Sequence, residues 1–205
     1  MKTYWQIKDE IVGPAIKEDF DQIGQKKTRE ALESFIIKEN DSRTLLLDAG
    51  CNTGVEAFRL MQKGFQGKYL GVDSNSKAIK LASDNLKKFK NVKFEMWHLE
   101  ELPFKDSSFD IVLSKDVIEH HKHYERILSE LTRVVRKWFI LSMFIKPSNF
   151  FPDKIKLHPD GYYLNRYNKR LLIDFIMERG FNNPSIIYKD YRDVVFAFSR
   201  IRLAR

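Results

Sequence analysis

A chain of 205 residues, of which 43% are hydrophobic and 31% charged, is long and apolar enough to build one domain with a complete core. This composition excludes an intrinsically disordered chain, and no apolar run reaches the length of a transmembrane helix. The single cysteine, Cys51, excludes an internal disulfide and, because no signal-peptide pattern precedes it, predicts a cytoplasmic protein.

The formal net charge of +8 makes a nucleic acid or an anionic surface a partner to consider. The basic residues, however, are scattered along predicted helices and mixed with acids, as in the segment KKTRE at residues 26–30. This pattern is typical of solvated helix faces, and the sequence contains no recognised nucleic-acid-binding motif. We therefore expect a small-molecule partner rather than nucleic acid, no stable insertion into a membrane, and a monomer or homodimer.

The hydrophobic pattern predicts alternating helices and strands along the chain. Residues 4–40 have a helical pattern with a break near Gly13 and Pro14. Strands are then predicted near residues 44–48, 68–72, 92–96, 109–114, 138–143, 184–188 and 193–199, and helices near residues 54–63, 75–88, 123–135 and 168–179. This alternation predicts an α/β fold with a mainly parallel sheet. The short link 189–192 implies that the last two strands pair antiparallel.

The segment LLLDAGCNTG at residues 45–54 is the most informative part of the chain. Its leucines predict a buried strand that ends at Asp48, and its glycines allow a tight turn before the next helix. A strand, a glycine turn and a helix are how doubly wound α/β domains hold a nucleotide-like cofactor. Glycines that serve packing alone are the alternative.

A second strand, KYLGVD at residues 68–73, also ends in an acid. The carboxylate of Asp73 can accept hydrogen bonds from both hydroxyls of a cofactor ribose. The glycine spacing is G-x-x-x-G after an acid rather than G-x-G-x-x-G, which argues against a nicotinamide site.

Taken together, these motifs resemble the class I S-adenosylmethionine-dependent methyltransferases. The closest likeness is to the branch with the ubiquinone- and menaquinone-biosynthesis enzymes and many small-molecule O-methyltransferases. Asp48, Gly50 and Gly54 match the D-x-G-x-x-x-G loop of that family, and Asp73 matches its ribose-binding acid. Residues 101–112, ELPFKDSSFDIV, match the stretch before its fourth strand, and residues 114–120, SKDVIEH, match its strand-four motif.

The resemblance implies a Rossmann-like seven-stranded sheet of order 3-2-1-4-5-7-6, with the last strand antiparallel and helices on both faces. It implies a helical lid at residues 1–40 and a methyltransferase domain at residues 41–205, within one globular unit. The cofactor would be S-adenosyl-L-methionine and its product S-adenosyl-L-homocysteine. The residues expected to bind it are Asp48, Gly50, Cys51, Asn52, Gly54, Asp73, Ser74, His98, Leu99, Ser114 and Asp116.

Two positions depart from the family pattern. Where relatives commonly carry an aspartate that faces the adenine, this chain has His98, whose imidazole either contacts the adenine or is an ordinary surface side chain. Leu99 and either Met96 or Trp97 would supply apolar walls. The segment 134–138, VVRKW, lacks the usual glycine-rich turn before the fifth strand, so that turn is expected to be shorter or differently shaped.

The acceptor side of the site has three open interpretations. Transfer to a hydroxyl needs a base or a metal to take its proton. Glu119, His120 and His121 are the candidate catalytic residues, and either histidine could be the base. A divalent cation could instead be held by Asp116, Glu119, His120 and His158. Glu119 and His120 could also be purely structural.

Acceptor recognition is expected from the aromatic, proline-bearing connection at residues 144–167, and Arg166 and Lys169 could add a contact to an anion. The sequence therefore predicts a methyltransferase that acts on a small molecule, at a hydroxyl oxygen. The alternatives are an RNA or tRNA methyltransferase and a non-catalytic binding protein of the same fold. The sequence does not identify the acceptor.

Overall fold

The computed structural model describes residues 23–159 and 161–201. The helices are α3 (Ile23–Lys38), α4 (Val55–Gln62), α5 (Ser76–Leu86), the short 3₁₀ helix η1 (Ile118–His120), α6 (Tyr124–Val134) and α7 (Lys169–Met177). The strands are β1 (Leu45–Ala49), β2 (Lys68–Asp73), β3 (Val92–Met96), β4 (Phe109–Lys115), β5 (Val135–Met143), β6 (Ser185–Lys189) and β7 (Val194–Ser199). Within these ranges, no helix has the length and apolar character needed to cross a membrane.

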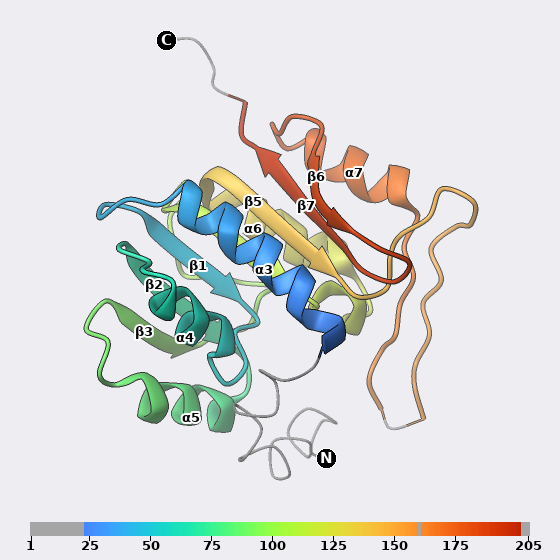
Figure 1. The fold of residues 1–205 in the computed structure, drawn as a ribbon. Helices are drawn as coiled ribbons and strands as arrows, with labels where there is room; N and C mark the ends of the chain where they lie inside the picture. Colours follow the sequence, from blue (N-terminus) through green and yellow to red (C-terminus); the bar gives the residue numbers. More distant parts are fainter. Residues whose placement is uncertain (1–22, 160, 202–205) are drawn as a thin grey trace.

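The strands form one seven-stranded sheet in the order β3-β2-β1-β4-β5-β7-β6 (Figure 1). Strands β1 to β5 pair in parallel, whereas β7 runs antiparallel to both β5 and β6. This confirms the predicted order and the antiparallel last strand. Because β1 is paired with β2 on one side and β4 on the other, the carboxyl ends of these three strands meet at one edge of the sheet.

The junction before β5 is more abrupt than the usual pattern. Helix α6 ends at Val134 and β5 begins at Val135, so no turn residue separates the two elements. Both side chains are fully buried. The missing glycine-rich turn is thus explained, and β5 starts three residues before the position that periodicity predicts.

Alternating side chains of the strands pack into two hydrophobic layers, one on each face of the sheet. On β1, Leu46 faces the layer formed with α3, α4 and α5. Its neighbour Leu47 faces the layer formed with α6 and α7. Figure 1 shows α3 and α4 in front of the sheet and α6 behind it.

Helix α3 is held on α4 by buried ion pairs as well as by its apolar side chains. Arg29 lies 3.0 Å from Glu56, and each side chain is 8% exposed. Glu33, which is fully buried, pairs with Arg59 and, at 2.7 Å, with Lys63. The described part of the N-terminal segment is therefore a packed helix of the domain. Residues 1–22 of the expected lid, including the predicted break at 13–14, lie outside the described residues.

A buried hydrogen bond links β1 and β2 beneath the glycine loop. The hydroxyl of Tyr69 donates to Asp48, and both residues are 2% exposed. Burial raises the pKa of Asp48 to about 7, although the bond from Tyr69 lowers it, and the negative charge of Glu56 raises it further. Ionising this carboxyl inside the folded protein therefore opposes stability.

Replacing Asp48 by Asn removes this titrating group and keeps an oxygen that accepts the Tyr69 hydroxyl. In the natural protein, the pKa of Asp48 is raised by folding. The protonated carboxyl therefore contributes its full stabilisation below about pH 4, and this contribution is lost as the pH rises through about 7. Between about pH 6 and about pH 8, the unfolding free energy of the natural protein should fall about 1.4 kcal/mol more than that of Asp48→Asn.

Urea unfolding across this pH range measures the difference. Asp84→Asn, an exposed carboxylate on α5, is the matched control and should follow the natural protein. Identical pH profiles for Asp48→Asn and the natural protein would show that the carboxyl at position 48 titrates normally.

Candidate functional site

The loop between β1 and α4 is tied to the end of β2 by its own backbone. The N–H groups of Gly50 and Cys51 donate to the carbonyl of Val72 at 2.8 and 3.0 Å. The N–H of Asn52 donates to Asp73 Oδ2 at 3.0 Å. These bonds place the loop directly against the carboxylate that ends β2.

Two glycines are required by this loop geometry. Gly50 has φ +85°, and a Cβ there would lie 2.4 Å from Val117 Cγ2 in the turn after β4. Gly54 has φ +80°, and its Cβ would lie 2.9 Å from the Phe94 ring. Both positions therefore need the left-handed backbone and the missing side chain of glycine.

Asp73 is positioned by two backbone donors. Its Oδ1 accepts from Asn75 N at 2.9 Å, and its Oδ2 accepts from Asn52 N at 3.0 Å. Burial raises the pKa of Asp73, while the bonds from Asn75 and Asn52 oppose that rise. Each carboxylate oxygen has two lone pairs, so both can accept a further hydrogen bond from a ligand.

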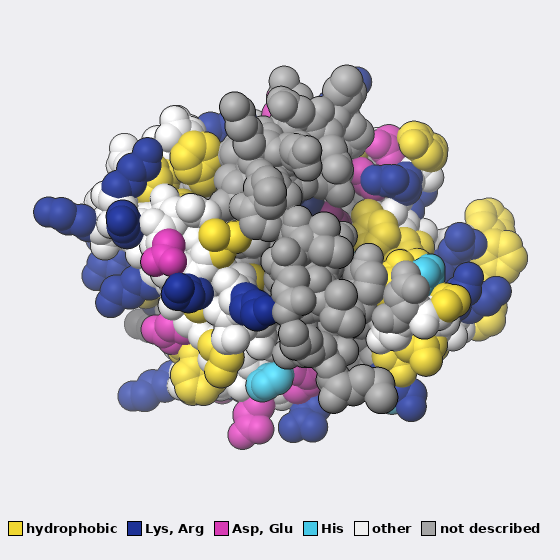
Figure 2. Space-filling view, turned by 90° about the horizontal axis from the view of Figure 1, so that it is seen from below, with side chains coloured by type: hydrophobic (Ala, Val, Ile, Leu, Met, Phe, Trp, Pro, Cys, Tyr) yellow, Lys and Arg dark blue, Asp and Glu magenta, His cyan; other side chains and the backbone are white. Residues whose placement is uncertain are grey.

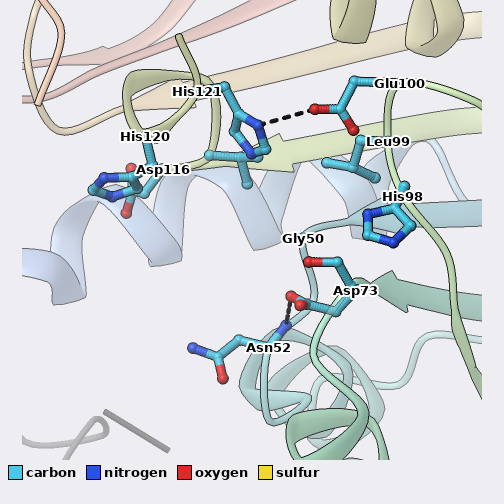
Figure 3. A pocket seen from close by; sticks show the side chains of 11 residues that line it. Gly50, Asn52, Asp73, His98, Leu99, Glu100, Asp116, His120 and His121 are labelled. Carbon is cyan, nitrogen blue, oxygen red and sulfur yellow. Dashed lines mark hydrogen bonds and ion pairs between the residues drawn. The ribbon is translucent and has the colours of Figure 1, made fainter. Parts of the chain in front are cut away.

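A cavity of about 290 Å³ opens above this loop and is lined by 11 residues (Figure 3). They are Gly50, Asn52, Asp73, Ser74, His98, Leu99, Glu100, Asp116, Val117, His120 and His121. In Figure 3, Asp73 and Asn52 lie across the cavity from His121 and Glu100. Its volume is at the lower end of the range for small-molecule sites, and its wall mixes apolar and polar groups as such sites do.

Most of the predicted cofactor-binding residues line this cavity, and four lie beneath it. Asp48, Cys51, Gly54 and Ser114 are not on its wall. The Cys51 side chain is buried next to Gly71, where burial raises the pKa of its thiol. The expectation that these four residues contact the cofactor stays a prediction.

The sequence interpretation missed two wall residues, Glu100 and Val117. His121 Nδ1 lies 3.4 Å from Glu100 Oε1, and the hydrogen bond from His121 lowers the pKa of Glu100 to about 2. The only signal in the sequence that these two residues line the cavity is that Glu100 follows Leu99 and Val117 follows Asp116. Leu99 lines the cavity as expected, whereas Met96 and Trp97, one of which was expected to add a second apolar wall, are exposed and not on its wall.

The chain turns sharply after β4 at Asp116. Its backbone has φ +57°, a left-handed conformation that is uncommon for residues other than glycine. Such a conformation costs roughly 1–3 kcal/mol of strain. Its N–H donates to Ser142 O at 2.9 Å, and its carboxylate pairs with Lys115. The turn leads directly into η1, which carries His120 to the cavity wall.

His120 is oriented by the segment after β5. Its Nδ1 lies 2.9 Å from the carbonyl oxygen of Tyr163, and its ring packs against Phe144 and Tyr162 with centroids 5.3 and 6.0 Å away. A carbonyl only accepts hydrogen bonds, so Nδ1 must carry the proton. In the neutral ring, Nε2 then carries the basic lone pair.

Glu119, the third candidate catalytic residue, is fully buried and does not line the cavity. Its Oε1 accepts from Phe144 N at 2.9 Å and thereby joins η1 to the end of β5. Burial and the nearby charge of Asp116 raise the pKa of Glu119 to about 8. The carboxyl is therefore largely neutral near pH 7, which fits a structural role.

The candidate metal ligands do not form a ligand set. Across residues 23–159 and 161–201, no group of three or more His, Cys, Asp or Glu side chains is placed to hold a metal ion. Glu119 lies behind the cavity wall, and His158 stacks on Tyr162 at 4.4 Å in the segment after β5. These four candidate ligands thus do not fit a divalent cation.

The chain matches known methyltransferases in both sequence and structure. The family described as "Methyltransferase domain" matches residues 40–150. Phthiotriol/phenolphthiotriol dimycocerosates methyltransferase 1 of Mycobacterium ulcerans is 32% identical over 105 residues, which are 51% of this chain and 38% of that protein. Arsenite methyltransferase of Halobacterium salinarum is 29% identical over 120 residues, which are 57% of this chain and 31% of that protein.

The alignments therefore span less than two fifths of the length of these curated relatives. Among solved structures, magnesium protoporphyrin IX methyltransferase of Synechocystis with bound S-adenosylhomocysteine has the same fold. It superposes with a TM-score of 0.67 at 18% identity and covers 87% of this chain and 84% of its own. The family match spans more than half of the 205 residues. The chain therefore belongs to the methyltransferase domain family, and its fold is that of a methyltransferase solved with bound S-adenosylhomocysteine.

Proposed function

We propose that the protein transfers a methyl group from S-adenosylmethionine to a hydroxyl oxygen of a small-molecule acceptor. The observation that carries this proposal is that a ribose-binding type of acid, Asp73, and an oriented imidazole, His120, line the same cavity. When bound, S-adenosylmethionine supplies a methyl group on a positively charged sulfur, which is already an activated leaving group. The protein has to align the acceptor, exclude water and remove a proton.

The donor half of the cavity fits the cofactor. Asp73 would accept hydrogen bonds from the ribose hydroxyls, since its two backbone donors leave lone pairs on both oxygens. Leu99 offers an apolar surface, and His98 a polar ring, for the adenine end. Gly50 and Asn52 would contact the amino-acid end from the loop.

The acceptor half supports general-base catalysis by His120. The bond to Tyr163 O fixes the proton on Nδ1 and leaves Nε2 as the atom that would take the acceptor proton. His121 is engaged with Glu100 through its Nδ1, so it is less suited to approach an acceptor. Glu119, which is behind the wall, would support η1 without touching the acceptor.

A small acceptor is favoured by the surroundings of His120 and by the relatives. The rings of Phe144 and Tyr162 beside it suit an apolar or aromatic molecule. The three relatives compared above are named for a mycobacterial lipid, arsenite and a porphyrin, which are all small molecules of very different shape.

Replacing Asp73 by Asn should weaken S-adenosylhomocysteine binding roughly tenfold to hundredfold, because the charge-assisted bonds to the ribose are lost. Isothermal titration calorimetry measures the affinity. The Asn side chain keeps one oxygen that can accept a hydrogen bond from the loop, so the variant should fold. Comparing the thermal unfolding of the variant and the natural protein without ligand separates a binding defect from a folding defect.

The matched control is again Asp84→Asn on α5, which should bind like the natural protein. Unchanged affinity in Asp73→Asn would contradict the assignment of this carboxylate to the ribose. If the natural protein binds no S-adenosylhomocysteine at all, the proposed activity itself is wrong.

Replacing His120 by Asn should lower turnover about 10²- to 10⁴-fold, the usual contribution of a general base. The Asn amide lies where Nδ1 lies and can still donate to Tyr163 O, but it has no atom in place of Nε2. Transfer of labelled methyl groups into a solvent extract of the source cells measures turnover, and calorimetry should show unchanged cofactor affinity.

His123→Asn, at an exposed position just before α6, is the matched control and should retain turnover. Because the donor set does not fit a cation, added chelator should leave turnover unchanged. Full activity of His120→Asn, or loss of activity on chelation, would contradict a metal-free mechanism with His120 as the base.

A further inference from the structure

The connection between β5 and α7 forms a hairpin that projects from the domain (Figure 1, orange). We refer to residues 146–170, which include the first two residues of α7, as the projecting hairpin. Its two arms pair antiparallel at Lys154 with Arg166 and at Leu157 with Tyr163. The N–H of each residue in the first pair donates to the carbonyl of the other, at 2.7 and 3.0 Å. Sequence patterning predicted only an aromatic connection here.

Large apolar side chains on the projecting hairpin face solvent. Phe150 is 89% exposed, Phe151 57%, Ile155 44% and Leu157 58%. Single exposed apolar residues are common on protein surfaces, but four on one short projection are a recognisable feature of interaction sites. Their burial against a partner would be favourable because of the hydrophobic effect.

The same segment is strongly basic. Six of its residues are Lys or Arg and two are Asp, as follows: Lys146, Lys154, Lys156, Arg166, Lys169, Arg170, Asp153 and Asp160. Figure 2 shows hydrophobic and basic side chains next to one another at the right-hand end of the molecule. A groove of about 390 Å³ at the root of the hairpin adds Lys189 to Lys146 and Lys169, over the apolar side chains of Val194 and Phe196.

We propose that the projecting hairpin docks the enzyme on the surface of an anionic lipid bilayer. Exposed phenylalanine and leucine side chains flanked by lysines are the chemistry of peripheral membrane attachment, with rings and aliphatic chains in the interface and ammonium groups on lipid phosphates. A nucleic acid would also attract the charges, and bases could stack on Phe150 and Phe151, but Ile155 and Leu157 have no ring face for stacking. All four side chains can enter a lipid interface.

The projecting hairpin is joined directly to the catalytic half of the cavity. Besides the contact of Tyr163 O with His120, Asn165 Nδ2 donates to His121 O at 2.6 Å, and Asn165 N donates to Glu119 O at 2.9 Å. Docking would thus hold the cavity close to the bilayer. Resting on the proposed function, this arrangement assigns the acceptor to amphipathic molecules that reside in the membrane.

Vesicle co-sedimentation tests the docking without any methyl transfer. The full-length protein should bind vesicles of phosphatidylcholine containing phosphatidylglycerol and bind pure phosphatidylcholine vesicles at least about tenfold more weakly, since each basic residue near an anionic surface contributes to attraction. Binding to the anionic vesicles should also weaken as salt is raised.

Two sets of variants separate the apolar and basic contributions. Phe150→Ser with Phe151→Ser, and Lys154→Gln with Lys156→Gln and Arg166→Gln, should each lower anionic-vesicle binding roughly tenfold or more. The matched controls are Met96→Ser, which is 54% exposed on the strand at the opposite edge of the sheet, and Lys77→Gln with Lys80→Gln and Lys87→Gln. The controls should bind vesicles like the natural protein.

Equal binding to neutral and anionic vesicles, or none to either, would overturn the proposal. So would tighter binding to RNA that displaces the protein from vesicles. A dimer in solution that the phenylalanine variants dissolve would assign the surface to a second copy instead. Calorimetry with S-adenosylhomocysteine on the same variants distinguishes failure of the docking proposal from failure of the proposed function. Loss of vesicle binding with intact cofactor binding concerns docking alone, and loss of cofactor binding with intact vesicle binding concerns the function alone.

Discussion

The hydrogen bonds from Gly50 and Cys51 to the carbonyl of Val72 are the constraint on which the site depends. They hold the loop after β1 against the end of β2, so that the carboxylate of Asp73 receives the next backbone N–H, from Asn52. The absence of a side chain at Gly50 then lets Val117 pack over the loop from the turn after β4. Three strand ends are thereby brought around one cavity.

The two halves of this cavity have different origins in the chain. The donor half is formed by backbone geometry, in which Asp73 is held by two N–H groups. The half that we propose to face the acceptor is formed by a strained turn at Asp116 and by the projecting hairpin, whose Tyr163 carbonyl orients His120.

Strand periodicity and glycine spacing are local signals, and they were sufficient to predict the individual elements and the loop after β1. The sheet order and most of the cavity-lining residues near Asp73 came from the family resemblance. They could not show that Glu119 points away from the cavity, since D-x-x-E-H spacing does not determine which side chains a 3₁₀ turn buries. The hairpin at 154–166 was missed although residues 154–157, KIKL, alternate between polar and apolar side chains. Its arms pair only through isolated bridges, so no strand longer than a few residues marks it in the sequence. The sequence pattern also did not predict that β5 begins directly after α6 at Val135, because this junction depends on the burial of Val134 and Val135 in the core.

A crystal structure of the protein with S-adenosylhomocysteine would test the central claim most directly, namely that one cavity joins a donor site at Asp73 to a base at His120. The account predicts ribose hydroxyls within hydrogen-bond distance of the Asp73 carboxylate, and the sulfur on the side of the cavity where His120 lies. A ligand bound elsewhere, or one whose sulfur faces away from His120, would contradict it.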